Sequence, residues 1–198
     1  MKTGIFGGAF NPVHNGHINL LKCYKRELAL DRIIVIPTAV PPHKTSEYLI
    51  SESHRLNMLK LAFEDFDGIE ISDIEFKRQG KSYTYDTVEQ LKKHYPDDDF
   101  YLIVGSDQYL YFQNWYRADD ILKSVTLCTA AREKGDEYEK MLSYKKSFSN
   151  MKNSIISLFP VVEASSSQIR LRIKQGKSID NLVPSAVAQY IGENRLYE

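Results

Sequence analysis

The chain has 198 residues, of which 42% are hydrophobic and 26% charged, and its 26 Lys and Arg balance its 26 Asp and Glu. This balance argues against a basic nucleic-acid-binding surface or a polybasic membrane patch, and no apolar run reaches the roughly 18 residues of a membrane helix. Cys23 and Cys128 have no C-x-x-C spacing, no His, Cys and carboxylate set has metal-ligand spacing, and no signal peptide precedes the first apolar segment. We therefore predict one domain spanning residues 1–198, located in the cytoplasm, with no metal bound by the protein itself.

Apolar segments alternate with amphipathic segments along the whole chain. Strands are predicted at residues 3–6, 32–38, 69–76 with a break near Asp73, 99–104, 125–130 and 155–161. Helices are predicted from about residue 18, at 51–66 with Ser51 or Ser53 as cap, 86–94, 118–123, 168–175 and 185–194, and residues 135–153 as a surface helix and flexible loop. This alternation predicts an α/β fold, a Rossmann-like doubly wound, mainly parallel sheet of five to six strands with helices on both faces.

The segment from Lys2 to Leu21 has the clearest chemical signal. Gly7 and Gly8 follow a short apolar strand, and His14 and His17 stand where a helix begins. Adjacent glycines leave backbone N–H groups uncovered, a helix start favours an anion, and the two histidines add side-chain donors. The spacing matches neither a Walker loop nor the dinucleotide-binding fingerprint. It predicts a phosphate-binding corner.

Further phosphate ligands follow other predicted strands, and ligands bind at this edge of doubly wound sheets. They are Lys44, Arg132, Arg170 and the serines 165–167. Each has an ordinary alternative, since the serines are typical of a helix cap and Trp115 and Asp107 suit packing and capping equally well. We interpret His43, His54 and His94 as surface or structural residues. The convergence of these residues, rather than any one of them, favours a phosphate site.

Five segments in order resemble the bacterial nicotinate-nucleotide adenylyltransferases. They are GGAFNPVHNGH at 7–17, VPPHK at 40–44, SYTYDT at 82–87, GSDQYLYFQNW at 105–115 and ASSSQIR at 164–170, with a VP…YI…LY tail. The first and last of the five are similar to those of the wider nucleotidyltransferase superfamily, whose H-x-G-H is related to the HIGH motif. The SYTYDT and GSD…W segments resemble the nicotinate branch.

The resemblance implies that the chain transfers the adenylyl group of ATP to nicotinate mononucleotide, giving nicotinate adenine dinucleotide and pyrophosphate in NAD biosynthesis. It implies catalytic roles at the ATP phosphates for His14, His17 and Arg170, with Mg²⁺ bound mainly through those phosphates. It implies ATP contacts for Gly7, Gly8, Phe10, Gly16, Ser166, Ser167 and Ile169. It implies mononucleotide contacts for Lys44, Tyr83, Thr84, Asp107, Trp115 and Arg132, in which the backbone at 83–84 meets the pyridine carboxylate, Trp115 stacks on the ring and Asp107 meets a ribose.

Two departures from the family pattern are visible. Arg132 is followed by Glu-Lys-Gly where the family commonly has Pro-Gly, and Ser167 stands where Thr is usual. We expect His17 to have a pKa near its ordinary value of about 6.5. Another superfamily adenylyltransferase with a phosphopantetheine acceptor, and a non-catalytic nucleotide-binding module, remain the alternatives. The expected partners are ATP and nicotinate mononucleotide, without nucleic acid or membrane, and a homo-oligomer is left open.

Overall fold

The computed structural model describes residues 1–41, 49–132, 136–160, 162 and 164–198. The strands are β1 (Lys2–Gly8), β2 (Arg32–Pro37), β3 (Ile69–Ile71), β4 (Asp99–Val104), β5 (Thr126–Arg132) and β6 (Ile155–Phe159). The helices are α1 (Asn15–Glu27), α2 (Glu52–Ala62), α3 (Thr84–His94), α4 (Ser106–Tyr111), α5 (Ala118–Ser124), α6 (Glu137–Ser147), α7 (Ser166–Lys174) and α8 (Ser185–Glu193), with short 3-10 turns η2 (Phe112–Asn114) and η3 (Ser149–Met151). Within these ranges, no helix combines the length and apolar character needed to cross a membrane.

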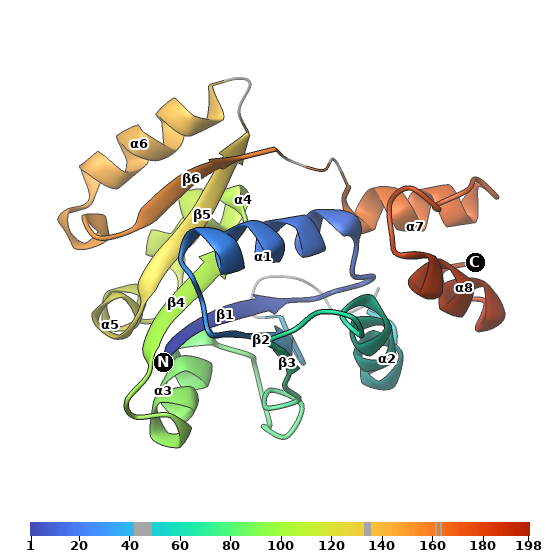
Figure 1. Cartoon of the computed structure of the whole chain (residues 1–198), viewed down its shortest axis with the longest axis horizontal. Helices are drawn as coiled ribbons and strands as arrows, with labels where there is room; N and C mark the ends of the chain where they lie inside the picture. The colour runs from blue at the N-terminus through green and yellow to red at the C-terminus, as the bar shows by residue number, and fades with distance from the viewer. Residues whose placement is uncertain (42–48, 133–135, 161, 163) are drawn as a thin grey trace.

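The six strands form one parallel sheet in the order β3-β2-β1-β4-β5-β6, which confirms the predicted fold class (Figure 1). The chain winds outward from β1 in one direction through β2 and β3. It then returns to the other side of β1 with β4. The strand order therefore reverses between β1 and β4, and the carboxyl ends of these two strands mark the place where doubly wound sheets bind ligands.

Each face of the sheet has its own hydrophobic core, because successive strand residues point to opposite faces. Phe6 of β1 belongs to the first core, with the apolar residues of α1, α2, α7 and α8, whereas its neighbour Ile5 belongs to the second core, with those of α3, α4, α5 and α6. In β2, Ile33 and Ile34 divide in the same way. This two-sided burial explains why the central strands are continuous apolar runs in the sequence.

Two regions differ from the predicted elements. The third strand ends at Ile71, because Asp73 begins a turn in which its carbonyl accepts the N–H of Phe76 at 2.9 Å. The predicted break near Asp73 is therefore confirmed, whereas the prediction that the strand resumes and reaches residue 76 is wrong. The described part of 135–153 is more ordered than predicted, since α6 and η3 bury Met141 and Met151 completely against the second core.

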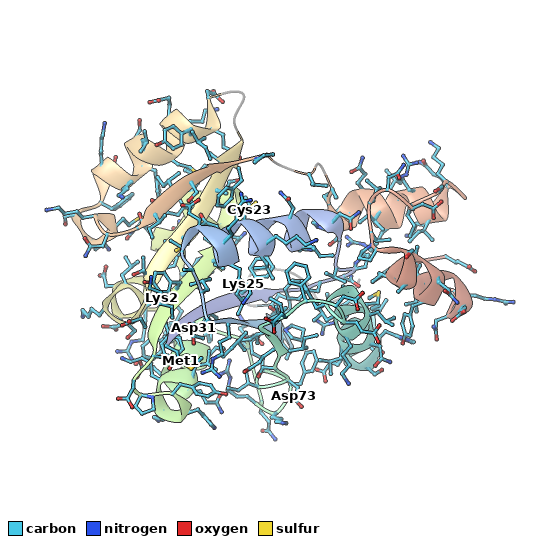
Figure 2. The ribbon with its side chains drawn as sticks, viewed as in Figure 1. Met1, Lys2, Cys23, Lys25, Asp31 and Asp73 are labelled. Carbon is cyan, nitrogen blue, oxygen red and sulfur yellow. The ribbon has the colours of Figure 1, made fainter. Side chains whose placement is uncertain are left out.

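Polar pairs close the amino edge of the sheet, where Figure 2 shows Met1, Lys2 and Asp31 together, far from α7 and α8. The Lys2 N–H donates to Asp31 at 2.7 Å. Arg32 forms an ion pair with Asp98 at 2.7 Å, and Asp98 also accepts the hydroxyl of Thr3. These side-chain contacts occupy the amino edge of the sheet. A cleft lies at the opposite, carboxyl edge.

Candidate functional site

A cleft of about 1110 Å³ opens at the carboxyl ends of β1 and β4. It is lined by residues from the loops after β1, β2, β3, β4 and β6 and from the start of α7. Thirteen of the predicted site residues line it: Gly7, Gly8, Phe10, His14, Gly16, His17, Tyr83, Thr84, Asp107, Trp115, Ser166, Ser167 and Arg170. The tertiary structure therefore gathers residues from distant parts of the chain into one cavity, as the strand-edge argument predicts.

Three predicted residues are placed differently. Lys44 lies outside the residues that the structure describes, and so does the side chain of Arg132, which ends β5. The side chain of Ile169 is completely buried in the core beneath α7. Ile169 is not among the residues that line the cleft, and its side chain supports α7 from inside.

The two histidines form a stacked pair at the start of α1. Their ring centroids are 3.6 Å apart with planes inclined by 22°, and the Phe10 ring packs edge-on against His17 at 5.1 Å. The backbone N–H of His14 donates to Nδ1 of His17 at 3.2 Å. Because Nδ1 accepts this bond, a neutral His17 ring must have its proton on Nε2, which makes Nε2 a hydrogen-bond donor.

Burial keeps both rings neutral at physiological pH. It lowers the pKa of His14 from 6.5 to about 4. It lowers the pKa of His17 well below 6.5, and the neighbouring His14 adds a smaller effect in the same direction. The prediction of an ordinary pKa for His17 is therefore wrong, because the sequence does not show that Phe10 and the first core enclose the ring. The Nδ1 atom of His14 is buried and has no hydrogen-bond partner among the described residues.

Gly16 fits where a side chain would collide with the histidine pair. A Cβ atom at this position would lie 3.1 Å from Nδ1 of His14 and 3.1 Å from the carbonyl oxygen of Val162. The adjacent Asn15 N–H is already bonded to the Leu182 carbonyl at 2.9 Å. Of the open donors expected at this helix start, the Gly16 N–H is the one left without a partner in the described part of the chain.

The start of α7 is fastened to the loop after β1. The Ser166 hydroxyl donates to the Pro12 carbonyl at 2.8 Å, and Arg170 donates to the Asn11 carbonyl at 2.7 Å and to the Ser167 hydroxyl at 3.2 Å. Ser165 is the helix cap, because its hydroxyl accepts the backbone N–H of Gln168. The sequence prediction of a serine cap is thus confirmed for Ser165, while the next two serines and Arg170 line the cleft.

The opposite part of the cleft contains the start of α3. Tyr83 is the N-cap residue, but its side chain makes no capping hydrogen bond. The N–H groups of Thr84 and Tyr85 therefore have no partner among the described residues. Ser82 holds this loop in place, since its hydroxyl accepts the N–H groups of Ala39 and Val40 at 3.1 and 3.2 Å. The result is a fixed helix N-terminus whose donors suit an anion.

Aromatic side chains border the same part of the cleft. Tyr83 and Tyr116 lie with ring centroids 4.7 Å apart, and Trp115 packs on Phe112 at 5.1 Å. Tyr116 is half exposed and Tyr111 nearly so, and both line the cavity. Sequence reasoning singles out Trp115 and misses these two tyrosines, although they lie within the GSD…W segment or directly after it.

Arg55 is a site residue whose role the sequence does not reveal. It is 1% exposed, and its guanidinium donates to the carbonyl of Ala9 at 3.0 Å and to that of Thr38 at 2.6 Å. Burial lowers its pKa from the ordinary value. It ties together the loops after β1 and β2, which both line the cleft. The sequence carries one signal of its burial: Arg55 stands three and four positions before the buried Met58 and Leu59, so the three residues share one face of α2.

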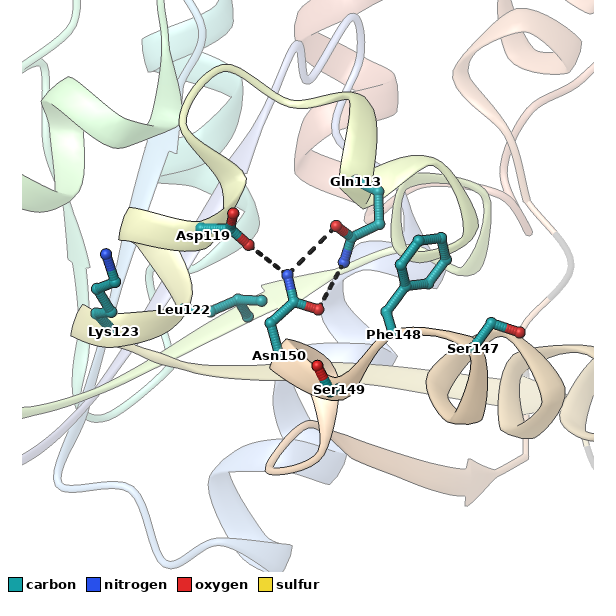
Figure 3. Close-up of a pocket in the computed structure, with 8 residues that line it drawn as sticks. All are labelled: Gln113, Asp119, Leu122, Lys123, Ser147, Phe148, Ser149 and Asn150. Atoms are coloured by element: carbon teal, nitrogen blue, oxygen red, sulfur yellow. Dashed lines mark hydrogen bonds between the residues drawn. The ribbon is translucent and has the colours of Figure 1, made fainter.

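A second hollow of about 680 Å³ lies between α5 and the α6–η3 connection (Figure 3). Its polar side chains bond one another: Asn150 exchanges hydrogen bonds with Gln113 and donates to Asp119. Figure 3 shows Lys123 and Ser147 at the two ends of the hollow, away from this group. Because the central polar groups are already paired, this hollow is not organised for a ligand.

Comparisons with known proteins identify a matching family model and relatives that match nearly the whole chain. Residues 5–172 match the family model described as Cytidylyltransferase-like. A probable nicotinate-nucleotide adenylyltransferase of Streptococcus pyogenes serotype M1 is 39% identical over 197 residues, covering 100% of this chain and 89% of the relative. A protein of the same description from Carboxydothermus hydrogenoformans is 41% identical over 198 residues, covering 99% of this chain and 98% of the relative.

Solved structures show the same fold at lower identity. A Plasmodium falciparum nicotinic acid mononucleotide adenylyltransferase complexed with NaAD superposes with a TM-score of 0.80 at 22% identity, covering 100% of this chain and 98% of that one. The same enzyme complexed with APC gives 0.77 at 21% identity, covering 99% and 96%.

Proposed function

Because this chain belongs to the nicotinate-nucleotide adenylyltransferase family, we propose that it transfers the adenylyl group of ATP to nicotinate mononucleotide, forming nicotinate adenine dinucleotide and pyrophosphate in NAD biosynthesis. One observation supports this proposal most directly. A single cleft is lined by the histidine pair and Arg170 at the starts of α1 and α7 and also by the start of α3, which has no side-chain cap, among aromatic rings.

The ATP half of the site is the corner built by the histidine pair. His17 presents Nε2–H, Arg170 contributes a permanent positive charge, and Ser166 and Ser167 lie beside it in the cleft wall. We assign the triphosphate to these groups and the adenosine to the backbone at Gly7, Gly8 and Gly16 and the ring of Phe10. Arg170 is already oriented by the Asn11 carbonyl, so little side-chain freedom is lost when phosphate binds.

The acceptor half is the region around α3 and α4. The open N–H groups of Thr84 and Tyr85 are suited to the pyridine carboxylate, and Trp115 offers a ring face for stacking. Asp107, in the first turn of α4, is suited to a ribose hydroxyl. Lys44 and Arg132, from outside the described residues and side chains, are proposed as further cations on this half.

The proposed reaction is a direct displacement at phosphorus. A phosphate oxygen of nicotinate mononucleotide forms a bond to the α-phosphorus of ATP while the bond to the bridging oxygen breaks, and pyrophosphate departs with that electron pair. The nucleophile is already an anion at neutral pH, so no general base is needed. The chain supplies alignment and stabilises developing charge through His17 Nε2–H and Arg170.

We propose that Mg²⁺ takes part through the ATP phosphates. No group of three or more His, Cys, Asp or Glu in the described part of the chain is arranged to hold a metal, so phosphate oxygens and water are its expected ligands. When bound, Mg²⁺ would neutralise charge on the leaving pyrophosphate. We also propose a cytoplasmic location, since both cysteines are free thiols.

The first test is an acceptor panel. The protein is incubated with ATP and Mg²⁺ plus nicotinate mononucleotide, nicotinamide mononucleotide or phosphopantetheine, and pyrophosphate and the dinucleotide product are measured. We expect turnover with nicotinate mononucleotide. Product from phosphopantetheine alone would transfer the chain to another branch of the superfamily, and ATP binding without pyrophosphate release from any acceptor would indicate a non-catalytic nucleotide-binding module.

The second test removes one backbone donor from the acceptor half. Thr84 is the first residue of α3, where proline is tolerated, and Tyr83 before it has φ −81° and ψ 129°, which a following proline requires. Thr84→Pro deletes the N–H and keeps the helix, whereas Thr84→Ala keeps the N–H and deletes the side chain. Loss of one hydrogen bond to a carboxylate is worth about 1.5–3 kcal/mol, roughly a tenfold to 150-fold rise in the KM for nicotinate mononucleotide.

Thr84→Ala and the KM for ATP are the internal controls, and neither should change more than about twofold. The neutral nicotinamide mononucleotide should be less affected than the acid by Thr84→Pro. Equal KM values for nicotinate mononucleotide in Thr84→Pro and in the unmodified chain would contradict the assignment of the carboxylate to this helix start.

A further inference from the structure

The chain ends in a turn that directs Tyr197 back toward the cleft. After α8, the Leu196 N–H bonds the Ile191 carbonyl at 3.0 Å and the Arg195 N–H bonds the Gly192 carbonyl at 3.2 Å. Together with the left-handed φ of 48° at Arg195, this is a Schellman motif, and Leu196 and Ile191 both belong to the first core. The chain therefore reverses at a fixed point, and it ends between α7 and α8 (Figure 1).

Tyr197 contacts the loop that follows β1. Its hydroxyl donates to Oδ1 of Asn11 at 2.9 Å across 186 positions of sequence. Tyr197 has a φ of 70°, a conformation that residues other than glycine rarely adopt, so surrounding contacts must hold it there. Burial raises the pKa of the phenol, which remains a protonated donor at physiological pH.

Asn11 connects this contact to the phosphate corner. It is 4% exposed and lines the cleft. Its side-chain oxygen also accepts the Ile50 N–H at 3.4 Å, and its main-chain oxygen accepts a hydrogen bond from the Arg170 guanidinium at 2.7 Å. Three residues further on, His14 begins the stacked pair. A shift of Asn11 would thus move both Arg170 and the backbone that leads into the histidines.

We propose that Tyr197 is a positioning residue for ATP, acting through Asn11 on the phosphate corner. This inference rests on the proposed function only in assigning the triphosphate to Arg170 and the histidines. Tyr197 itself need not touch the nucleotide. Its role is to hold the loop after β1 in the geometry that Arg170, Ser166 and His14 share.

Tyr190, which lies within α8, offers a matched control. Its hydroxyl bonds Nδ1 of His54 at 2.9 Å and Nδ2 of Asn57 at 3.0 Å, joining α8 to α2. Tyr190→Phe and Tyr197→Phe are thus the same chemical change, each removing one hydroxyl that fastens the C-terminal region to the body of the protein. Of these two hydroxyls, that of Tyr197 bonds a residue that also bonds Arg170.

The experiment measures ATP·Mg²⁺ binding by calorimetry for both variants and for a chain that lacks residues 197–198 but keeps Leu196. We expect the Kd for ATP to rise about threefold to tenfold in Tyr197→Phe and in the truncated chain, and to stay within twofold in Tyr190→Phe. Melting temperatures are measured alongside, and a comparable small decrease is expected for both Phe variants. An unchanged Kd in both Tyr197→Phe and the truncated chain would overturn the proposal.

A double-mutant cycle with Asn11→Ala separates positioning from general destabilisation. If Tyr197 acts through Asn11, the double variant should bind ATP no more than about twofold worse than Asn11→Ala alone. Multiplicative losses would show that the two residues act independently and would overturn the proposal. Binding needs no acceptor, so a chain that binds ATP but fails to adenylylate nicotinate mononucleotide refutes the proposed function while the role of Tyr197 is still measured.

Discussion

Lowering the pH should destabilise the fold through the buried histidine pair. The pKa of His14 is about 4 in the folded chain and 6.5 in its ordinary state. Between these values the unfolded chain binds a proton that the folded chain refuses, so the free energy of unfolding falls as the pH falls from 6.5 toward 4. Well above pH 6.5 the ring is neutral in both states, so His14 causes no loss of stability there.

The size of the effect follows from the two pKa values. Between about pH 7.5 and about pH 5, His14 alone should lower the free energy of unfolding by about 2 kcal/mol. Its side chain is 8% exposed, so solvent screening reduces this only slightly. His17 should add to the loss in the same direction, since burial lowers its pKa further. The stacked rings cannot both become charged without repulsion at a centroid distance of 3.6 Å.

The assay is urea unfolding of the unmodified chain and of His14→Asn at both pH values. Asparagine is a good N-cap residue, so α1 should still form. We expect the pH-dependent loss to be about 2 kcal/mol smaller in His14→Asn. His94→Asn is the control, because His94 is an exposed residue at the end of α3 and should leave the difference unchanged. An equal pH-dependent loss in His14→Asn and the unmodified chain would refute the burial argument.

Three further predictions concern the cleft and its support. His17→Ala should lower kcat by an amount equivalent to roughly 2.7–4 kcal/mol of transition-state stabilisation in the pyrophosphate assay, and turnover within tenfold of the unmodified chain would contradict its role as donor. Gly16→Ala should lower kcat/KM by about tenfold to 100-fold with little change in melting temperature, because the new methyl group displaces the His14 ring. Gly192→Ala is the control, because a Cβ there meets nothing within 4 Å, and it should leave activity unchanged. Arg55→Leu should cost about 2 kcal/mol or more in urea unfolding, since it leaves the carbonyls of Ala9 and Thr38 without their donor. A loss below about 0.5 kcal/mol would show that water replaces the guanidinium.

Several features of the protein follow from the sequence because they depend on near neighbours in the chain. The segment 99–104 is observed with the same bounds as β4, because burial on both faces of the sheet favours the continuous apolar run that follows the exposed Asp99. The helix start near His14 and the serine cap at Ser165 are likewise decided by local backbone chemistry, whereas the turn predicted at Gly7 and Gly8 is wrong because both glycines pair with β2 as the last residues of β1. The family motifs lie in such segments, which explains why the two halves of the cleft were predictable.

Other features exist only in the folded chain. The pKa of His17 depends on burial beside Phe10 and the surrounding core. Nothing in the sequence pattern of Arg55 names the two carbonyls that it joins. The contact between Asn11 and Tyr197 spans 186 positions.

These differences have one physical reason. A local pattern reports which face of an element is apolar and where its backbone can turn, but it does not report which distant groups share a buried volume. Desolvation, hydrogen-bond partners and the spacing of ligands around the cleft are properties of that shared volume. The sequence alone therefore determines the elements and the chemistry brought to the sheet edge, while tertiary packing alone decides the protonation of the histidine pair and the contact between Tyr197 and Asn11.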